Sequence, residues 1–98
     1  MGKYFFTNKA VEDLSNIWEY TYDVWGEKQA DKYYESLIEY CKEISQRPEI
    51  GKNYNAIDSG VLGFKAGKHN ILYRISSGAI EVLRILHERM DLRTRLQD

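Results

Sequence analysis

The sequence predicts an α+β domain in which a short N-terminal strand and a two-helix hairpin pack on a small, mainly antiparallel β-sheet. Apolar residues recur with a helical period in the first half of the chain and follow strand-like patterns in the last third. The only proline, Pro48, lies where the first pattern ends. With 98 residues, 43% of them hydrophobic, the chain is expected to form one domain over residues 1–98.

The N-terminal part predicts a strand followed by a helix. Residues 3–6, a lysine followed by three aromatic residues, predict a short strand, and Thr7 is a suitable N-cap for a helix over about residues 8–25. Gly26 is suited to end that helix. The apolar stripe that defines the helix has the spacing i, i+4, i+7, i+8, i+11 and i+15: Ala10, Leu14, Ile17, Trp18, Thr21 and Trp25.

A second apolar stripe begins after Gly26 and ends before Arg47 and Pro48, which predicts the other helix of the hairpin. Cys41 lies on this stripe and is expected to fill space in the core. The members of the stripe are Ala30, Tyr33, Tyr34, Leu37, Cys41 and Ile44. The segment from Pro48 to Gly60 is rich in turn-forming residues and predicts a loop.

Three strands are predicted at residues 62–66, 69–76 and 79–87, joined by hairpin turns at Gly67-Lys68 and Ser77-Gly78. Strict alternation would place Ile80, Val82, Arg84 and Leu86 on one face of the last strand, and Glu81, Leu83, Ile85 and His87 on the other. Both faces carry apolar groups, so this strand should be central and covered on both sides. The first strand is free to pair in parallel through the helical crossover, and a short helical turn is expected at residues 90–95.

Charge and cysteine content exclude several classes of protein. Lys and Arg total 14 against 15 Asp and Glu, a formal charge of −1, which argues against indiscriminate binding to nucleic acid. Residues 63–98 nevertheless hold 7 basic and 4 acidic groups, a balance of +3. No signal peptide or membrane span is expected, and a single cysteine fits a reducing cytoplasm.

The candidate chemical groups lie on the predicted sheet. His69 and His87 could meet, but the spacing offers no third zinc ligand, so we expect no metal and no cofactor. Arg74 and Arg84 interrupt apolar strands and must reach water, a partner, or an acid such as Glu81 or Asp91. Such cations could also serve metal-free RNA cleavage with a histidine as acid or base.

The predicted hairpin carries more aromatic residues than two helices of a small domain can bury. Trp18 is the best candidate for core packing. The others include Tyr20, Tyr22, Trp25 and Tyr40, and surplus aromatics of this kind are typical of a protein-binding surface.

Four spaced motifs resemble the RelE/ParE superfamily of bacterial toxins, on the ParE side, in order along nearly the whole chain. They are Trp18-Glu19-Tyr20-Thr21 with Trp25-Gly26-Glu27-x-x-Ala30-x-x-Tyr33, Arg47-Pro48-Glu49-x-Gly51-Lys52, Gly67-Lys68-His69-x-Ile71-x-Tyr73-Arg74-Ile75, and Ile80-Glu81-Val82-Leu83-Arg84-Ile85-Leu86-His87-Glu88-Arg89-Met90-Asp91. The resemblance implies the same fold, two N-terminal helices on an antiparallel sheet. It also implies the toxin of a type II toxin–antitoxin module, of the kind that stabilises plasmids, neutralised by a ParD-like antitoxin.

The two branches of the superfamily imply different targets. ParE-like toxins inhibit DNA gyrase and so block replication and growth, whereas RelE-like toxins cut mRNA in the ribosome. The run from His87 to Asp91 looks like the ParE ending. The last three residues, Leu96-Gln97-Asp98, end acidic and lack the Tyr or Arg expected of the nuclease. We therefore favour a cytoplasmic, non-catalytic gyrase inhibitor. The alternatives are a ribosome-dependent mRNA endonuclease using Arg84 and His87, and a toxin-derived domain that acts only in an autoregulatory complex.

Two surfaces are predicted on these grounds. The antitoxin should bind the aromatic hairpin through Trp18, Tyr22, Trp25 and Tyr33. The target should bind the basic C-terminal part through Arg84, His87, Arg89, Met90, Asp91 and Arg93. Operator DNA would be reached only through the antitoxin.

Overall fold

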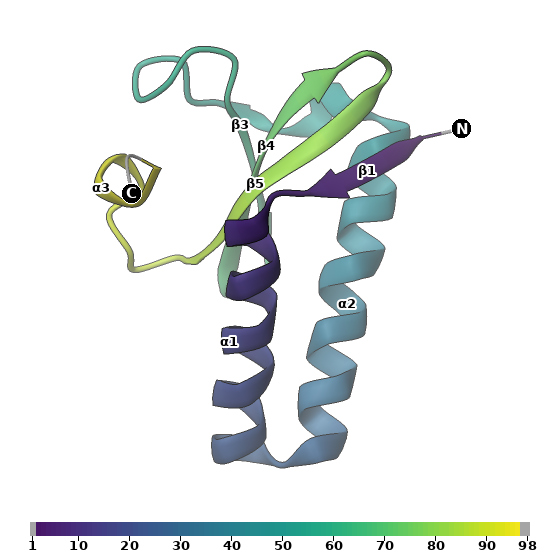
Figure 1. Cartoon of the computed structure of the whole chain (residues 1–98), viewed down its shortest axis with the longest axis vertical. Coiled ribbons are helices and arrows are strands. Elements are labelled where there is room, and N and C mark those ends of the chain that lie inside the picture. The colour runs from purple at the N-terminus through teal and green to yellow at the C-terminus, as the bar shows by residue number, and fades with distance from the viewer. Residues whose placement is uncertain (1, 97–98) are drawn as a thin grey trace.

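A computed structural model describes residues 2–96. Its elements are β1 (Lys3–Phe6), α1 (Asn8–Trp25), α2 (Glu27–Gln46), the 3-10 turn η1 (Pro48–Ile50), β2 (Lys52–Asn53), β3 (Leu62–Ala66), β4 (His69–Ser76), β5 (Ala79–His87) and α3 (Leu92–Leu96). The strands form one mixed sheet in the order β1-β5-β4-β3-β2, with β1 parallel to β5. Figure 1 shows that α1 and α2 run side by side and that the far end of their hairpin extends beyond the sheet. The predicted α+β class is confirmed.

The helical hairpin is defined by its capping residues. The Thr7 hydroxyl oxygen accepts a hydrogen bond from the Ala10 N–H at 3.1 Å, which caps the start of α1. Gly26 is the single residue between α1 and α2, and its φ of 94° lies in a region that favours glycine. Its N–H donates to the carbonyl of Tyr22, so one residue ends the first helix and starts the second.

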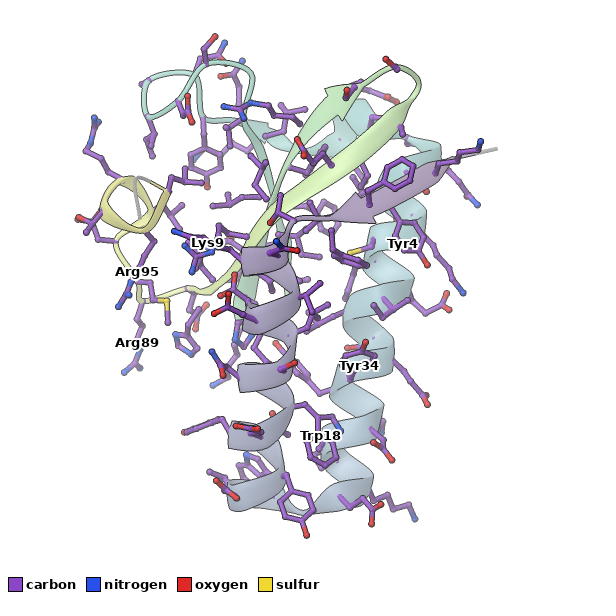
Figure 2. The ribbon with its side chains drawn as sticks, in the orientation of Figure 1. Tyr4, Lys9, Trp18, Tyr34, Arg89 and Arg95 are labelled. Carbon is purple, nitrogen blue, oxygen red and sulfur yellow. The ribbon has the colours of Figure 1, made fainter. Side chains whose placement is uncertain are left out.

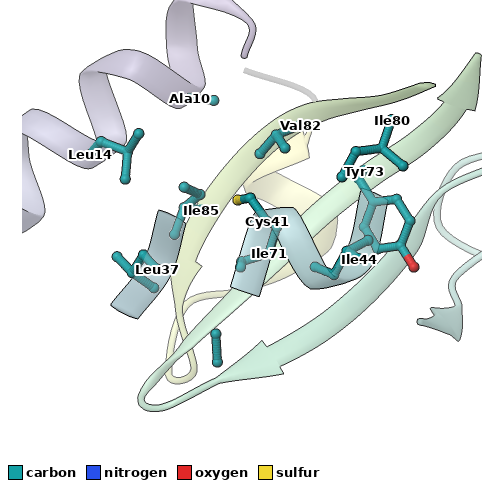
Figure 3. Close-up of a cluster of buried hydrophobic side chains, with 11 residues drawn as sticks. Ala10, Leu14, Leu37, Cys41, Ile44, Ile71, Tyr73, Ile80, Val82 and Ile85 are labelled. Atoms are coloured by element: carbon teal, nitrogen blue, oxygen red, sulfur yellow. The ribbon is translucent and has the colours of Figure 1, made fainter. Parts of the chain in front are cut away.

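The main core lies between the hairpin and the sheet (Figure 3). Cys41 is fully buried there, as predicted, and burial raises the pKa of its thiol to about 12. The buried members are Ala10, Leu14, Leu37, Cys41, Ile44, Ala66, Ile71, Tyr73, Ile80, Val82 and Ile85.

The predicted alternation along β5 is wrong beyond Val82 because the strand contains a β-bulge. Tyr73 pairs with Val82 and Leu72 pairs with Arg84, so Leu83 is an extra residue in β5. Downstream of it, Ile85 joins the core on the helix side, whereas Leu86 joins the opposite face. The insertion shifts the side-chain period by one residue.

The opposite face of the sheet carries a second, smaller cluster, which confirms that β5 is covered on both sides. Its buried members are Val61, Leu72 and Leu86. Leu92 and Leu96 of α3 pack against them, together with Tyr54 and Leu83. The short C-terminal helix therefore completes a hydrophobic layer.

Candidate binding surfaces

The β5 bulge is held in place by the first turns of α1. The Thr7 hydroxyl donates to the Leu83 carbonyl at 2.8 Å, and the Ile85 N–H donates to Asp13 Oδ2 at 3.0 Å. These contacts pair backbone groups on either side of Arg84. They fix the position from which the Arg84 side chain leaves the strand.

Arg84 forms a largely buried ion pair with Asp13, not with the predicted acids Glu81 or Asp91. Its Nε and Nη2 donate to the two oxygens of Asp13 at 2.8 and 3.1 Å, and the two side chains are only 14% and 12% exposed. Its Nη1 also donates to the carbonyl of Arg95 at 2.8 Å. Arg84 thus joins β5 to α1 through two parallel hydrogen bonds to a carboxylate, a geometry that suits the guanidinium group. Its third bond joins β5 to α3.

Arg74 also has a different partner from those predicted. Its Nη2 donates to Asp58 Oδ2 at 3.0 Å, from β4 to the loop before β3. A cavity of about 260 Å³ lies between this pair and Arg84, and Lys9 from the start of α1 also lines it. The cavity brings together three cationic side chains from three elements, together with Asp58, and both arginines are paired with an acid.

The two histidines do meet, as a cross-strand pair between β4 and β5. The rings of His69 and His87 are 5.3 Å apart at their centroids. The Tyr33 oxygen accepts a hydrogen bond from the Lys68 N–H and lies 2.6 Å from His69 Nδ1, so we assign the hydroxyl as the donor to that nitrogen. Burial, reinforced by His87, lowers the pKa of His69 to about 4, and His69 is therefore neutral at pH 7.

Both imidazoles already have a partner at Nδ1, because the Arg89 N–H donates to His87 Nδ1 at 3.2 Å. Within residues 2–96, no three His, Cys, Asp or Glu side chains gather as metal ligands. The contact between Tyr33 and His69 joins the start of β4 to α2.

The four residues predicted to bind the antitoxin lie in two separate parts of the structure. Trp18 and Tyr22 stack on one another with centroids 5.2 Å apart, and Trp25, 71% exposed, ends the same helix. Tyr33 instead contacts His69 on the sheet side. The expectation that Trp18 packs in the core is wrong, since this half-buried side chain lies outside both apolar clusters.

Trp18 lines a groove between α1 and α2. The sequence did not predict this groove. The groove has a volume of about 400 Å³ and is lined by Ser15, Trp18, Glu19, Asp31 and Tyr34. Figure 2 shows Trp18 between α1 and α2, with Tyr34 further along α2. The indole N–H of Trp18 donates to Asp31 Oδ1 at 2.9 Å across the groove.

The predicted target-binding residues are partly engaged within the protein. Asp91 accepts hydrogen bonds from the Arg93 N–H and the Thr94 hydroxyl, and the Thr94 bond in particular lowers the pKa of its carboxyl group. Met90 is 40% exposed, and Arg89 and Arg93 are also exposed. Figure 2 shows Arg89 and Arg95 projecting on the α3 side of the molecule.

None of the helices in the described residues 2–96 is both long and apolar enough to span a membrane. The fold is shared with chains from two solved bacterial toxin–antitoxin systems. It superposes with a TM-score of 0.77 on a chain from a chromosomal ParDE system of P. aeruginosa, at 24% identity over 89% of this chain and 96% of that one. The TM-score is 0.67 for a chain of the RelBE2 toxin–antitoxin complex of Mycobacterium tuberculosis, at 22% identity over 88% and 96%.

Sequence comparison matches this chain to one family of toxins. Residues 4–92 match the family described as the ParE toxin of type II toxin–antitoxin system, parDE. Toxin ParE1 of Mycobacterium tuberculosis is 36% identical over 93% of this chain and 94% of its own length, and Toxin ParE1 of Caulobacter vibrioides is 30% identical over 98% and 99%. Toxin ParE of Escherichia coli is 32% identical over 100% and 96%. This chain belongs to the ParE toxin family of type II toxin–antitoxin systems.

Proposed function

We propose that this ParE-type toxin acts in the cytoplasm by inhibiting DNA gyrase, that it has no catalytic residues of its own, and that a ParD-like antitoxin neutralises it. The observation that carries the proposal is the match to the ParE family over residues 4–92. The hydrogen bonds of the two nuclease candidates support it. The Arg84 guanidinium is paired with Asp13, and the backbone N–H bonded to His87 Nδ1 leaves the proton of the neutral ring on Nε2, so in this tautomer His87 has no free nitrogen to act as a general base.

The target-binding surface in this proposal is the exposed C-terminal segment around Arg89, Met90 and Arg93. An exposed apolar side chain between two arginines is typical of an interface centre. The test is a gyrase supercoiling assay with the triple variant Arg89→Ala/Met90→Ala/Arg93→Ala, and Lys28→Ala/Lys32→Ala on α2 as the control. The triple variant should lose inhibition while the control keeps it. Full inhibition by a folded triple variant would exclude this surface.

The antitoxin surface is the aromatic side of the hairpin, where Trp18, Tyr22 and Trp25 gather. A disordered antitoxin segment that folds on binding could cover this extended surface. The double variant Tyr22→Ala/Trp25→Ala should weaken antitoxin binding by more than about tenfold, because exposed aromatics often dominate interface energies. Affinity within about twofold of wild type, in a variant with an unchanged circular dichroism spectrum, would contradict the placement.

A ribosome-dependent mRNA endonuclease remains the alternative function, supported by the cavity that Lys9, Arg74 and Arg84 line. Arg74 and Arg84 are paired with Asp58 and Asp13, and Lys9, which forms no ion pair within residues 2–96, could stabilise the charge of a phosphorane. Under this alternative, His87→Ala or Arg84→Ala would abolish mRNA cleavage in translating ribosomes while supercoiling stays unaffected by the wild-type protein. Cleavage without any effect on gyrase would replace our proposal.

A further inference from the structure

Helix α1 presents a second apolar stripe beside the one that faces the core. Val11, Trp18 and Tyr22 recur at i, i+7 and i+11, with Ser15 between them at i+4, so they lie along one flank of the helix. Val11 is 50% and Tyr22 is 47% exposed. This flank borders α2 at the groove that Asp31 and Tyr34 complete.

The Trp18 ring is fixed in that groove by contacts on two sides. It stacks on Tyr22 at an interplanar angle of 24°, and its N–H is held by Asp31 Oδ1. Tyr34 contributes a second aromatic ring to the lining from the other helix (Figure 2). A ring held in this way offers a preorganised surface for a planar group.

The charge of the groove is entirely negative. Glu19 and Asp31 are its only ionisable acids, and no Lys, Arg or His lines it. Within the described part of the chain, Glu19 forms no side-chain hydrogen bond or ion pair, and Asp31 uses only Oδ1. The groove thus combines an aromatic wall with carboxylate oxygens that remain available to a cation.

We propose that this groove is a receptor site for one arginine side chain of the antitoxin, an inference that rests on the antitoxin surface proposed above. The guanidinium would stack on the rings of Trp18 and Tyr34 and donate to Asp31 Oδ2 and to the Glu19 carboxylate. Charge complementarity selects a cation. Arginine fits better than lysine because its planar, weakly hydrated head both stacks and donates in a fork.

The site would act as a specificity element between this toxin and antitoxins of related modules. An antitoxin without an arginine at that point would leave Glu19 and Asp31 covered and unpaired, which disfavours binding. Apolar contacts along Val11 and Tyr22 would supply area, while the arginine would fix the register of the bound segment.

The first test is calorimetric titration of the cognate antitoxin into wild-type toxin, Asp31→Asn and the matched control Asp23→Asn. Asparagine keeps an oxygen for the Trp18 N–H, so the groove should stay formed. Asp23 is an exposed acid on α1 outside the groove lining, and its variant changes the net charge equally. We expect Asp31→Asn to weaken binding by about tenfold, the effect of losing a charge-assisted hydrogen bond, and Asp23→Asn to stay within about twofold.

The second test uses N-acetylargininamide as a probe, with the citrulline analogue as its uncharged counterpart. In NMR titrations, the arginine probe should shift the Trp18 indole N–H signal more than that of Trp25, and Asp31→Asn should remove the difference. Equal antitoxin affinity of Asp31→Asn and wild type, or equal probe shifts at Trp18 and Trp25, would overturn the arginine site and leave the proposed function standing. Failure of the antitoxin to bind wild-type toxin would overturn the proposed antitoxin partner, and the probe titration would still decide the site.

Discussion

At the scale of single residues, the structure depends on a few side chains that join distant parts of the chain. Asp13 accepts two hydrogen bonds from Arg84 and one from the backbone of Ile85. Thr7 caps α1 and also binds the carbonyl of Leu83. These two residues of α1 and its cap therefore hold the bulge of β5 and the arginine that it presents.

Replacing Asp13 should be strongly destabilising because Arg84 would then keep its charge in a largely enclosed site without this partner. We expect Asp13→Ala to lower the free energy of unfolding by about 3 kcal/mol, the loss typical of breaking a buried ion pair. Urea denaturation would measure this. The neighbouring acid Glu12 is exposed, so Glu12→Ala should change stability by less than about 0.5 kcal/mol. A loss below about 1 kcal/mol for Asp13→Ala would show that the pair contributes little.

His69 predicts a specific dependence of stability on pH. Its pKa is about 4 in the folded protein against 6.5 for the free side chain, so the unfolded chain binds more protons between these values. The contribution of His69 to stability is therefore complete above pH 6.5 and is lost as the pH falls toward 4. Unfolding at a series of pH values should show this decline, and His69→Gln should flatten it. An identical pH profile in the variant would contradict the pKa shift.

At the scale of elements, Gly26 is the point on which the hairpin depends. An added Cβ would meet no atom within 4 Å, so substitution costs only backbone strain at a φ of 94°. We expect Gly26→Ala to reduce stability by about 1–3 kcal/mol in urea denaturation. Gln29→Ala, at an exposed position in α2, is the matched control and should be close to neutral. Equal stabilities of the two variants would mean that the backbone at residue 26 can change its conformation without cost.

The elements that could be predicted from the sequence are those whose signals are local. Thr7 and Gly26 delimit α1, and the turns at Gly67 and Ser77-Gly78 delimit the strands, because capping and turn chemistry act within a few residues. Strand β2 escaped prediction because its two residues are ordered by pairing with β3.

Features of the candidate site that depend on distant partners could not be predicted. The bulge at Leu83 leaves no mark in the pattern of β5, and Asp13 lies 71 residues from Arg84 in sequence. The groove between α1 and α2 needs Trp18 and Asp31 together, which a linear reading of either helix does not reveal. Helix α1 carries two apolar stripes, one facing the core and one facing the groove, and Trp18 fits the spacing of both. This explains why its spacing predicted a core residue.

At the scale of the whole molecule, the hairpin and the C-terminal segment differ in charge and in place. Residues 8–46 contain nine acidic and four basic groups, whereas residues 84–95 contain four basic and two acidic ones. Figure 1 shows the far end of the hairpin away from α3. The two proposed surfaces can therefore be altered separately, although Arg84 connects α1 to α3 through Asp13 and the Arg95 carbonyl.

Removal of residues 91–98 tests this separation. Loss of Leu92 and Leu96 would expose the cluster of Val61, Leu72 and Leu86, so the melting temperature should fall by several degrees, as expected for about 1–2 kcal/mol in a domain of this size. Below that temperature, antitoxin affinity should stay within about twofold, because the proposed antitoxin surface on α1 and α2 contains no residue of α3. Gyrase inhibition should decrease with the loss of Arg93. A truncated toxin that is folded by circular dichroism yet no longer binds antitoxin would show that the antitoxin also requires the C-terminal segment.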